Sequence, residues 1–172
     1  MRPFARSLAV AATLCATLLA PPATAQTITA ERTLYVAGLW EVTLARFDDG
    51  AQSCIASVSN RKGVFSIWGN DDNSVFIGVN SPGLGEMAKT TALHLVVDRR
   101  AGWDLLEVDA EGDDIFVEIA GDNAGTRLIR EIAAGNTVYL NNDIGGTEET
   151  FSLAGSAASI AALDGCMDAI VR

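Results

Sequence analysis

Residues 40–58 read WEVTLARFDDGAQSCIASV, and this stretch decides the fold. Apolar side chains occupy every second position from Trp40 to Leu44, and polar or small residues stand between them. This period of two is typical of a β-strand with one buried face. Residues 48–50 (Asp-Asp-Gly) have turn chemistry, and a second strand is predicted over 52–57. The stretch therefore predicts an antiparallel hairpin.

The same pattern continues along the chain. Further strands are predicted over 64–68, 74–79, 92–98, 103–108, 115–119, 137–140 and 149–153. Residues 80–90 are predicted to form a long loop, and residues 109–113 a hairpin connection. Short, regularly spaced strands joined by turn residues are typical of an antiparallel β-sandwich or barrel. The fold class predicted is mainly β, an antiparallel sandwich or barrel-like domain.

Two helices are predicted late in the chain. The first is short, begins near Thr126 and ends at Gly135, a residue that commonly follows a helix C-terminus. The second is C-terminal and is predicted to begin with Ser156 as its N-cap. Its apolar stripe, at spacings of three and four, consists of Ile160, Leu163, Met167 and Ile170.

The first 25 residues have the pattern of an export signal. Arg2 and Arg6 form a basic start, residues 8–20 carry no charge, and Ala23-Thr24-Ala25 is a small-x-small cleavage pattern. The apolar run is too short for a membrane-spanning helix, which needs about 20 residues. We expect cleavage after Ala25, a single β-rich domain over 26–172, and a periplasmic or secreted product.

The charge of the exported product narrows its partners. Cleavage removes Arg2 and Arg6 and no acidic residue, so the formal net charge of −10 becomes −12. Nucleic-acid binding depends on Lys and Arg that neutralise phosphates, and anionic lipid surfaces have the same requirement. We therefore expect no nucleic-acid partner and, because no later segment reaches membrane-spanning length, no membrane insertion.

Two cysteines remain after cleavage, Cys54 and Cys166, in a compartment that oxidises thiols. With two cysteines only one intramolecular pairing exists, and it closes most of the domain. A redox-active thiol or a metal site is the alternative. Both are disfavoured because the chain has no Cys-x-x-Cys motif and its one histidine is His94. The sequence predicts a structural disulfide between Cys54 and Cys166.

Two motifs suggest chemistry without the context that it needs. Residues 83–88, GLGEMA, match a dinucleotide fingerprint, but too few residues follow for the required helix, so a loop and no cofactor are predicted. His94 with the nearby Asp98 and a serine suggests a small periplasmic hydrolase. No Gly-x-Ser-x-Gly elbow supports that alternative, and no catalytic residue is assigned.

Acidic and aromatic residues also suggest ligand sites. Asp71-Asp72 and residues 109–114 offer oxygen ligands for calcium but lack the spacing of an EF-hand loop, so solvated turns are predicted and no metal ligand is assigned. Trp40 and Trp68 are predicted to pack in the core. Phe116 is predicted to lie opposite the apolar face of its strand, either in an exposed patch or under a helix.

Three features resemble one family of proteins. They are Gly38-Leu39-Trp40, the early Cys54, and the closing motifs Phe151-Ser152-Leu153-Ala154-Gly155-Ser156 and Ala161-Ala162-Leu163-x-x-Cys166. Together they are similar to small exported alphaproteobacterial proteins of the invasion-associated locus B type. The resemblance implies an exported β-rich fold with a disulfide and no established catalytic activity.

These observations favour an exported, non-enzymatic envelope or secreted module that binds a protein partner in the envelope or host. The alternatives are the hydrolase using His94 and a structural or cation-binding periplasmic protein. The sequence names neither the partner nor the surface that binds it.

Overall fold

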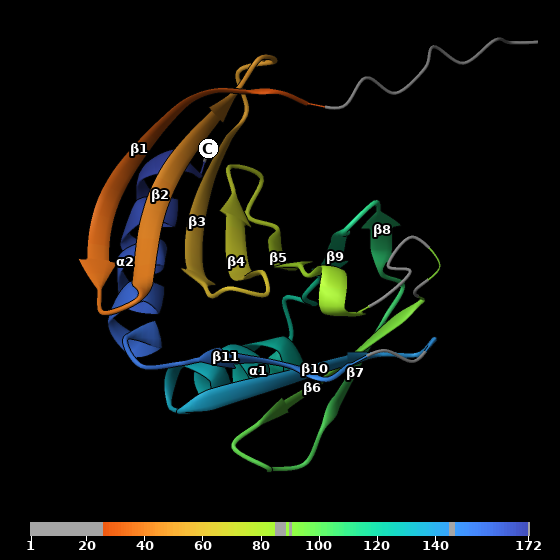
Figure 1. Cartoon of the computed structure of the whole chain (residues 1–172). Helices are drawn as coiled ribbons and strands as arrows, with labels where there is room; N and C mark the ends of the chain where they lie inside the picture. The colour runs from red at the N-terminus through yellow and green to blue at the C-terminus, as the bar shows by residue number, and fades with distance from the viewer. Residues whose placement is uncertain (1–25, 85–88, 90, 145–146, 172) are drawn as a thin grey trace, which may run out of the picture.

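A computed structural model describes residues 26–84, 89, 91–144 and 147–171 (Figure 1). The predicted export signal and most of the GLGEMA motif lie outside the described residues. The elements are β1 (Ile28–Ala37), β2 (Trp40–Phe47), β3 (Gln52–Ser59), β4 (Val64–Asn70), β5 (Val75–Asn80), a 3-10 turn (Pro82–Leu84), β6 (Ala92–Val97), β7 (Trp103–Leu106), β8 (Asp109–Glu111), β9 (Asp114–Glu118), α1 (Asn123–Ala133), β10 (Thr137–Asn142), β11 (Glu149–Ser152) and α2 (Ser156–Ile170).

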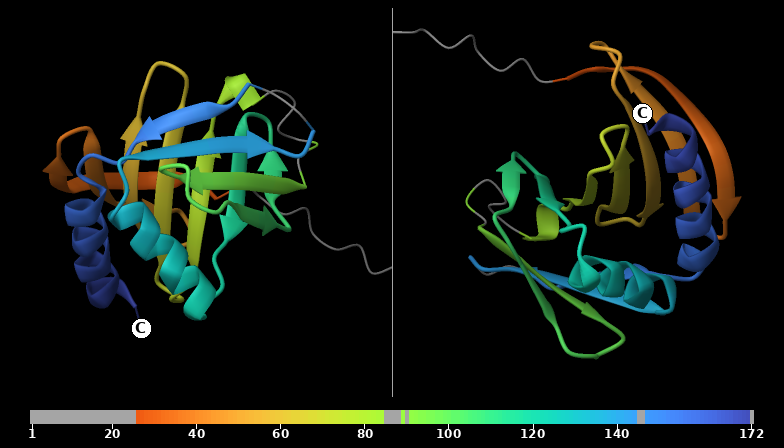
Figure 2. Two further views of the ribbon diagram at one scale, coloured as in Figure 1. Left: turned by 90° about the horizontal axis from the view of Figure 1, so that it is seen from below. Right: turned by 180° about the vertical axis from the view of Figure 1, so that it is seen from behind.

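The strands form two antiparallel sheets. The large sheet has the order β1-β2-β3-β4-β5-β9-β8, and the small sheet has the order β11-β10-β6-β7. Seen from below, the strands of the small sheet run across those of the large sheet, and α1 and α2 lie side by side at one end (Figure 2). The predicted mainly β, sandwich-like fold with a short late helix and a C-terminal helix is confirmed.

The core lies between one face of the large sheet and the layer formed by the small sheet and the helices. Trp40 is fully buried, as predicted, and its ring meets Phe65 edge-on at a centroid distance of 6.2 Å. Phe65 also lies 6.1 Å from Phe151 of β11. The Trp40 indole Nε1 donates a hydrogen bond of 2.9 Å to the backbone oxygen of Ser152. These contacts join the two sheets.

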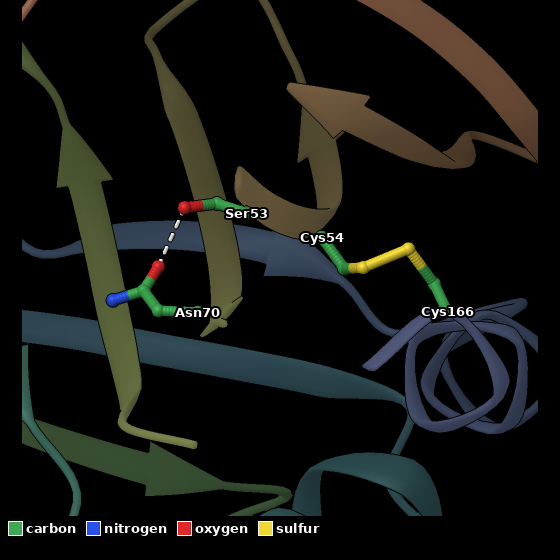
Figure 3. Close-up of a disulfide and its surroundings, with 4 residues drawn as sticks. All are labelled: Ser53, Cys54, Asn70 and Cys166. Atoms are coloured by element: carbon green, nitrogen blue, oxygen red, sulfur yellow. Dashed lines mark hydrogen bonds between the residues drawn. A yellow bond between two sulfur atoms is a disulfide. The ribbon is translucent and has the colours of Figure 1, made fainter. Parts of the chain in front are cut away.

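The predicted disulfide is confirmed and joins α2 to the large sheet (Figure 3). Cys54 of β3 and Cys166 of α2 have Cα atoms 6.0 Å apart, within the usual range for a disulfide. Ile160, Leu163 and Ile170 are buried on the same side of the helix. The C-terminal helix is therefore held by an apolar stripe and by a covalent bond.

The longest strand, β1, was not predicted. β1 pairs with β2 along its length and forms an edge of the large sheet, the outermost strand in Figure 1. Nearly all of its residues are exposed, so neither face carries the buried alternation on which the prediction of the other strands depends. Glu31-Arg32 interrupts its apolar residues, and two register shifts interrupt its pairing with β2.

Three local predictions were wrong. Ser156 does not cap α2: the N-cap is Gly155 with φ of 106°, and the Ser156 hydroxyl donates to the backbone oxygen of Ile132 at 2.9 Å. Residues 109–113 are not only a connection, because Asp109–Glu111 forms β8 and pairs with β9. Helix α1 begins earlier than predicted, where the Asp122 carboxylate accepts hydrogen bonds from two backbone amides.

Candidate binding groove on the large sheet

The face of the large sheet that points away from the core carries aromatic and polar side chains. The pairing register sets this face, because residues directly opposite each other on adjacent strands point to the same side. Trp68 pairs with Phe76, and Gly78 pairs with Phe116. The next strands follow the same rule, since Ser53 pairs with Asn70.

These side chains line a groove that we call the aromatic groove. Its volume is about 550 Å³, within the range of small-molecule and peptide-binding pockets. Its lining consists of Gln26, Ile28, Phe47, Ala51, Gln52, Ser53, Trp68, Asn70, Asp71, Asp72, Phe76, Asp109 and Phe116. The groove thus receives residues from each of the seven strands of the large sheet or from the turns beside them.

The aromatic pair of the groove is held in a fixed arrangement. The rings of Trp68 and Phe116 meet edge to face, with centroids 5.4 Å apart and planes at 82°. The Trp68 indole Nε1 donates to the hydroxyl of Ser66 at 2.8 Å, and that hydroxyl donates to the backbone oxygen of Gly78 at 3.1 Å. A Cβ at Gly78 would lie 2.6 Å from the Ser66 hydroxyl, so only glycine leaves room here.

Both aromatic residues were judged from the sequence, with different outcomes. Trp68 was predicted to pack in the core, and this was wrong: it is half-buried on the outer face, because its neighbour Ile67 takes the core position. Phe116 lies opposite the apolar face of β9, as predicted, and it is covered in part by Trp68 rather than by a helix.

The polar side of the groove is made of hydrogen-bonded side chains. The Ser53 hydroxyl donates to the side-chain oxygen Oδ1 of Asn70 at 2.6 Å (Figure 3). The Asn70 amide nitrogen donates to the Ser74 hydroxyl at 3.0 Å, and Ser74 donates in turn to the Asp72 carboxylate from its hydroxyl and its backbone amide. These two hydrogen bonds hold the pKa of Asp72 below its usual value.

Three carboxylates line the groove, and they come from the two acidic stretches weighed as calcium ligands. Asp71 and Asp72 follow β4, and Asp109 begins β8. No lysine, arginine or histidine is among the described lining residues. Within the described part of the chain, no three His, Cys, Asp or Glu side chains are close enough together to hold a metal ion. The groove is therefore anionic and aromatic.

His94 lies elsewhere, on the small sheet. Its Nδ1 is 2.7 Å from the Asp104 carboxylate on the neighbouring strand β7, and both side chains are at least half exposed. Asp98, the partner weighed from the sequence, instead accepts hydrogen bonds from the backbone amides of Asn136 and Thr137. The structure therefore does not pair His94 with Asp98, the arrangement that the hydrolase alternative needs.

In comparisons with known proteins, no family model, curated protein or solved structure matches this chain. No helix in the described ranges combines the length and apolarity needed to cross a membrane.

Sequence reasoning did not find the aromatic groove. The available signal was the second face of each strand, where Trp68 and Phe76 alternate with the core residues. That signal indicates that each strand carries an aromatic residue on its outer face. It does not indicate that these residues from different strands line one groove.

Proposed function

We propose that this chain is an exported, non-enzymatic module that binds a segment of a protein partner, in the envelope or in a host, through the aromatic groove. The observation that carries the proposal is the groove itself: a cluster of rings next to hydrogen-bonded polar side chains on a paired sheet. Aromatic residues dominate the energy of protein interfaces, and a site on paired strands is presented with little loss of conformational entropy on binding.

Three further facts support this proposal. The Cys54–Cys166 disulfide fits an oxidising compartment outside the cytoplasm. The resemblance to exported proteins of the invasion-associated locus B type favours a role in contact with other macromolecules. The pair formed by His94 and Asp104 is exposed and lies outside the groove lining, so the proposal gives it no part in binding.

The test is site-specific cross-linking in cells that export the protein. A photoreactive residue replaces Gln52 or Asp109 in the groove, and matched variants carry it at the exposed positions Ala157 and Asp168 of α2. We expect protein adducts from the groove positions that disappear when Trp68→Ala is added. Equal adducts from α2 positions, or adducts that survive Trp68→Ala, would contradict the proposal.

A further inference from the structure

The lining of the aromatic groove restricts what it can bind. It combines the carboxylates of Asp71, Asp72 and Asp109 with four aromatic rings, and it contains no described basic residue. An anionic ligand would meet like charges there. A neutral apolar ligand would remove water from the carboxylates, which costs free energy. A cation is the ligand that both groups favour.

A bare metal ion does not fit this arrangement. A divalent cation needs several oxygen ligands converging at about 2.0–2.6 Å from its centre. Among the described residues, no three acidic, histidine or cysteine side chains converge in this way. The carboxylates line a groove of about 550 Å³, which has room for a cation larger than a metal ion beside the rings.

The rings specify the type of organic cation. A guanidinium group stacks on aromatic faces and presents a planar array of donors that matches a carboxylate, whereas an ammonium is compact and strongly hydrated. The chain already contains this arrangement elsewhere: the Arg127 guanidinium lies 4.7 Å from the ring centroid of Trp103. The Trp103 indole also donates to the Glu131 carboxylate at 3.0 Å, so that site combines a ring, an acid and an arginine.

We infer that the aromatic groove binds an arginine side chain of the partner protein, with the guanidinium against the Trp68–Phe116 pair and in reach of the groove carboxylates. This inference rests on the proposed function, because it names the residue type that the groove recognises. The orientation of Trp68, held by Ser66, leaves the ring in place before the ligand arrives. The partner segment is therefore arginine-bearing.

The experiment is calorimetric titration of the mature protein with three short peptides of identical sequence that carry arginine, lysine or citrulline. Citrulline has the shape of arginine without its charge. We expect the arginine peptide to bind about tenfold more tightly than the citrulline peptide, as loss of a desolvated cation–π contact and an ion pair implies. The lysine peptide is expected between them. Equal affinity for arginine and citrulline overturns the inference.

Variants separate groove recognition from general attraction to an acidic protein. The groove variant is Asp71→Asn/Asp72→Asn/Asp109→Asn, and the control is Asp113→Asn/Glu148→Gln/Asp168→Asn, which changes the net charge equally away from the groove lining. We expect only the groove variant to lose affinity for the arginine peptide. Equal losses in both overturn the inference. Because Asp72 accepts hydrogen bonds from Ser74, Asp109→Asn alone against Asp113→Asn alone repeats the test without that change.

The outcomes also distinguish the ligand from the function. If cross-links form in the groove but the arginine and citrulline peptides bind equally, the proposed function stands and the recognition of arginine is refuted. Absence of both groove cross-links and peptide binding refutes both. Displacement of the arginine peptide by millimolar calcium, but not by sodium at equal ionic strength, shows a metal site and overturns the inference.

Discussion

Removing the disulfide is expected to destabilise the protein strongly. Cys54 and Cys166 are 112 residues apart, and Cys54 is fully buried. Closing a loop of this length lowers the entropy of the unfolded chain by an amount worth about 4–5 kcal/mol. This is a large part of a net stability of about 5–15 kcal/mol. For a protein of this size each kcal/mol shifts Tm by about 2–4 °C, so Cys54→Ala/Cys166→Ala should lower Tm by about 8–20 °C.

Differential scanning calorimetry on the parent, the double variant and the reduced parent measures this shift. The reduced parent is the control for the substitutions, because it loses the bridge and keeps both sulfur atoms. Hydrogen exchange adds a local readout: amides of α2 should lose protection first, since the bridge joins this helix to β3. A Tm shift below about 2 °C in both the variant and the reduced parent would refute the argument that the bridge limits the unfolded chain.

Four further changes test other parts of the structure. Leu163→Ala removes a buried side chain of α2 and should cost about 2–5 kcal/mol in urea unfolding, and a cost under about 1 kcal/mol would show that the helix is not part of the core. Burial, and then the nearby charge of Asp168, raise the pKa of Asp164, so the ionised carboxylate destabilises the fold above that pKa. Asp164→Asn should therefore raise Tm at pH 7, and this gain should vanish below about pH 3.9, where the carboxyl is protonated in the unfolded chain too. Gly78→Ala places a Cβ 2.8 Å from the Trp68 indole Nε1, so it should shift Trp68 fluorescence and weaken peptide binding, and unchanged binding would mean that the ring position is not needed. His94→Ala removes an exposed pair, so stability should change by less than about 0.5 kcal/mol, and loss of a hydrolase turnover on generic esters would contradict the non-enzymatic proposal.

The strands with one buried face were the part of the fold that the sequence predicted well. In β2, Trp40 and Val42 are fully buried and Glu41 between them is exposed, so burial follows the period of two there. Further along the strand the pattern fails, because Ala45 is buried and Leu44 is only half-buried. β1 was missed because this relation fails there: its residues are exposed on both sides and burial leaves no pattern. Hydrophobic periodicity reports burial, and it identifies a strand only where one face is covered.

The start of α2 shows a second limit. A serine at a helix start is a good N-cap, yet here the chain reaches the helix through Gly155 in a left-handed conformation, and Ser156 is the first helical residue. Its hydroxyl donates to the backbone oxygen of Ile132, 24 positions earlier in the chain. A hydrogen bond to a residue so distant in the chain takes the hydroxyl away from capping, and the sequence around Ser156 does not reveal it.

The aromatic groove depends on a pairing that no local pattern specifies. Trp68 and Phe76 belong to consecutive strands, so their meeting follows from a short hairpin. Phe116 reaches them only because β9 pairs with β5 although three strands lie between these two in the chain, and β8 then adds Asp109 beside Phe116. Alternation placed Phe116 off the apolar face of its strand, but the strand order decides which residues it meets there. The same strand order brings two separate acidic stretches to the lining of one groove. The groove is therefore a property of the topology. That its carboxylates and rings lie together can be inferred only when the strands beside β5 are known.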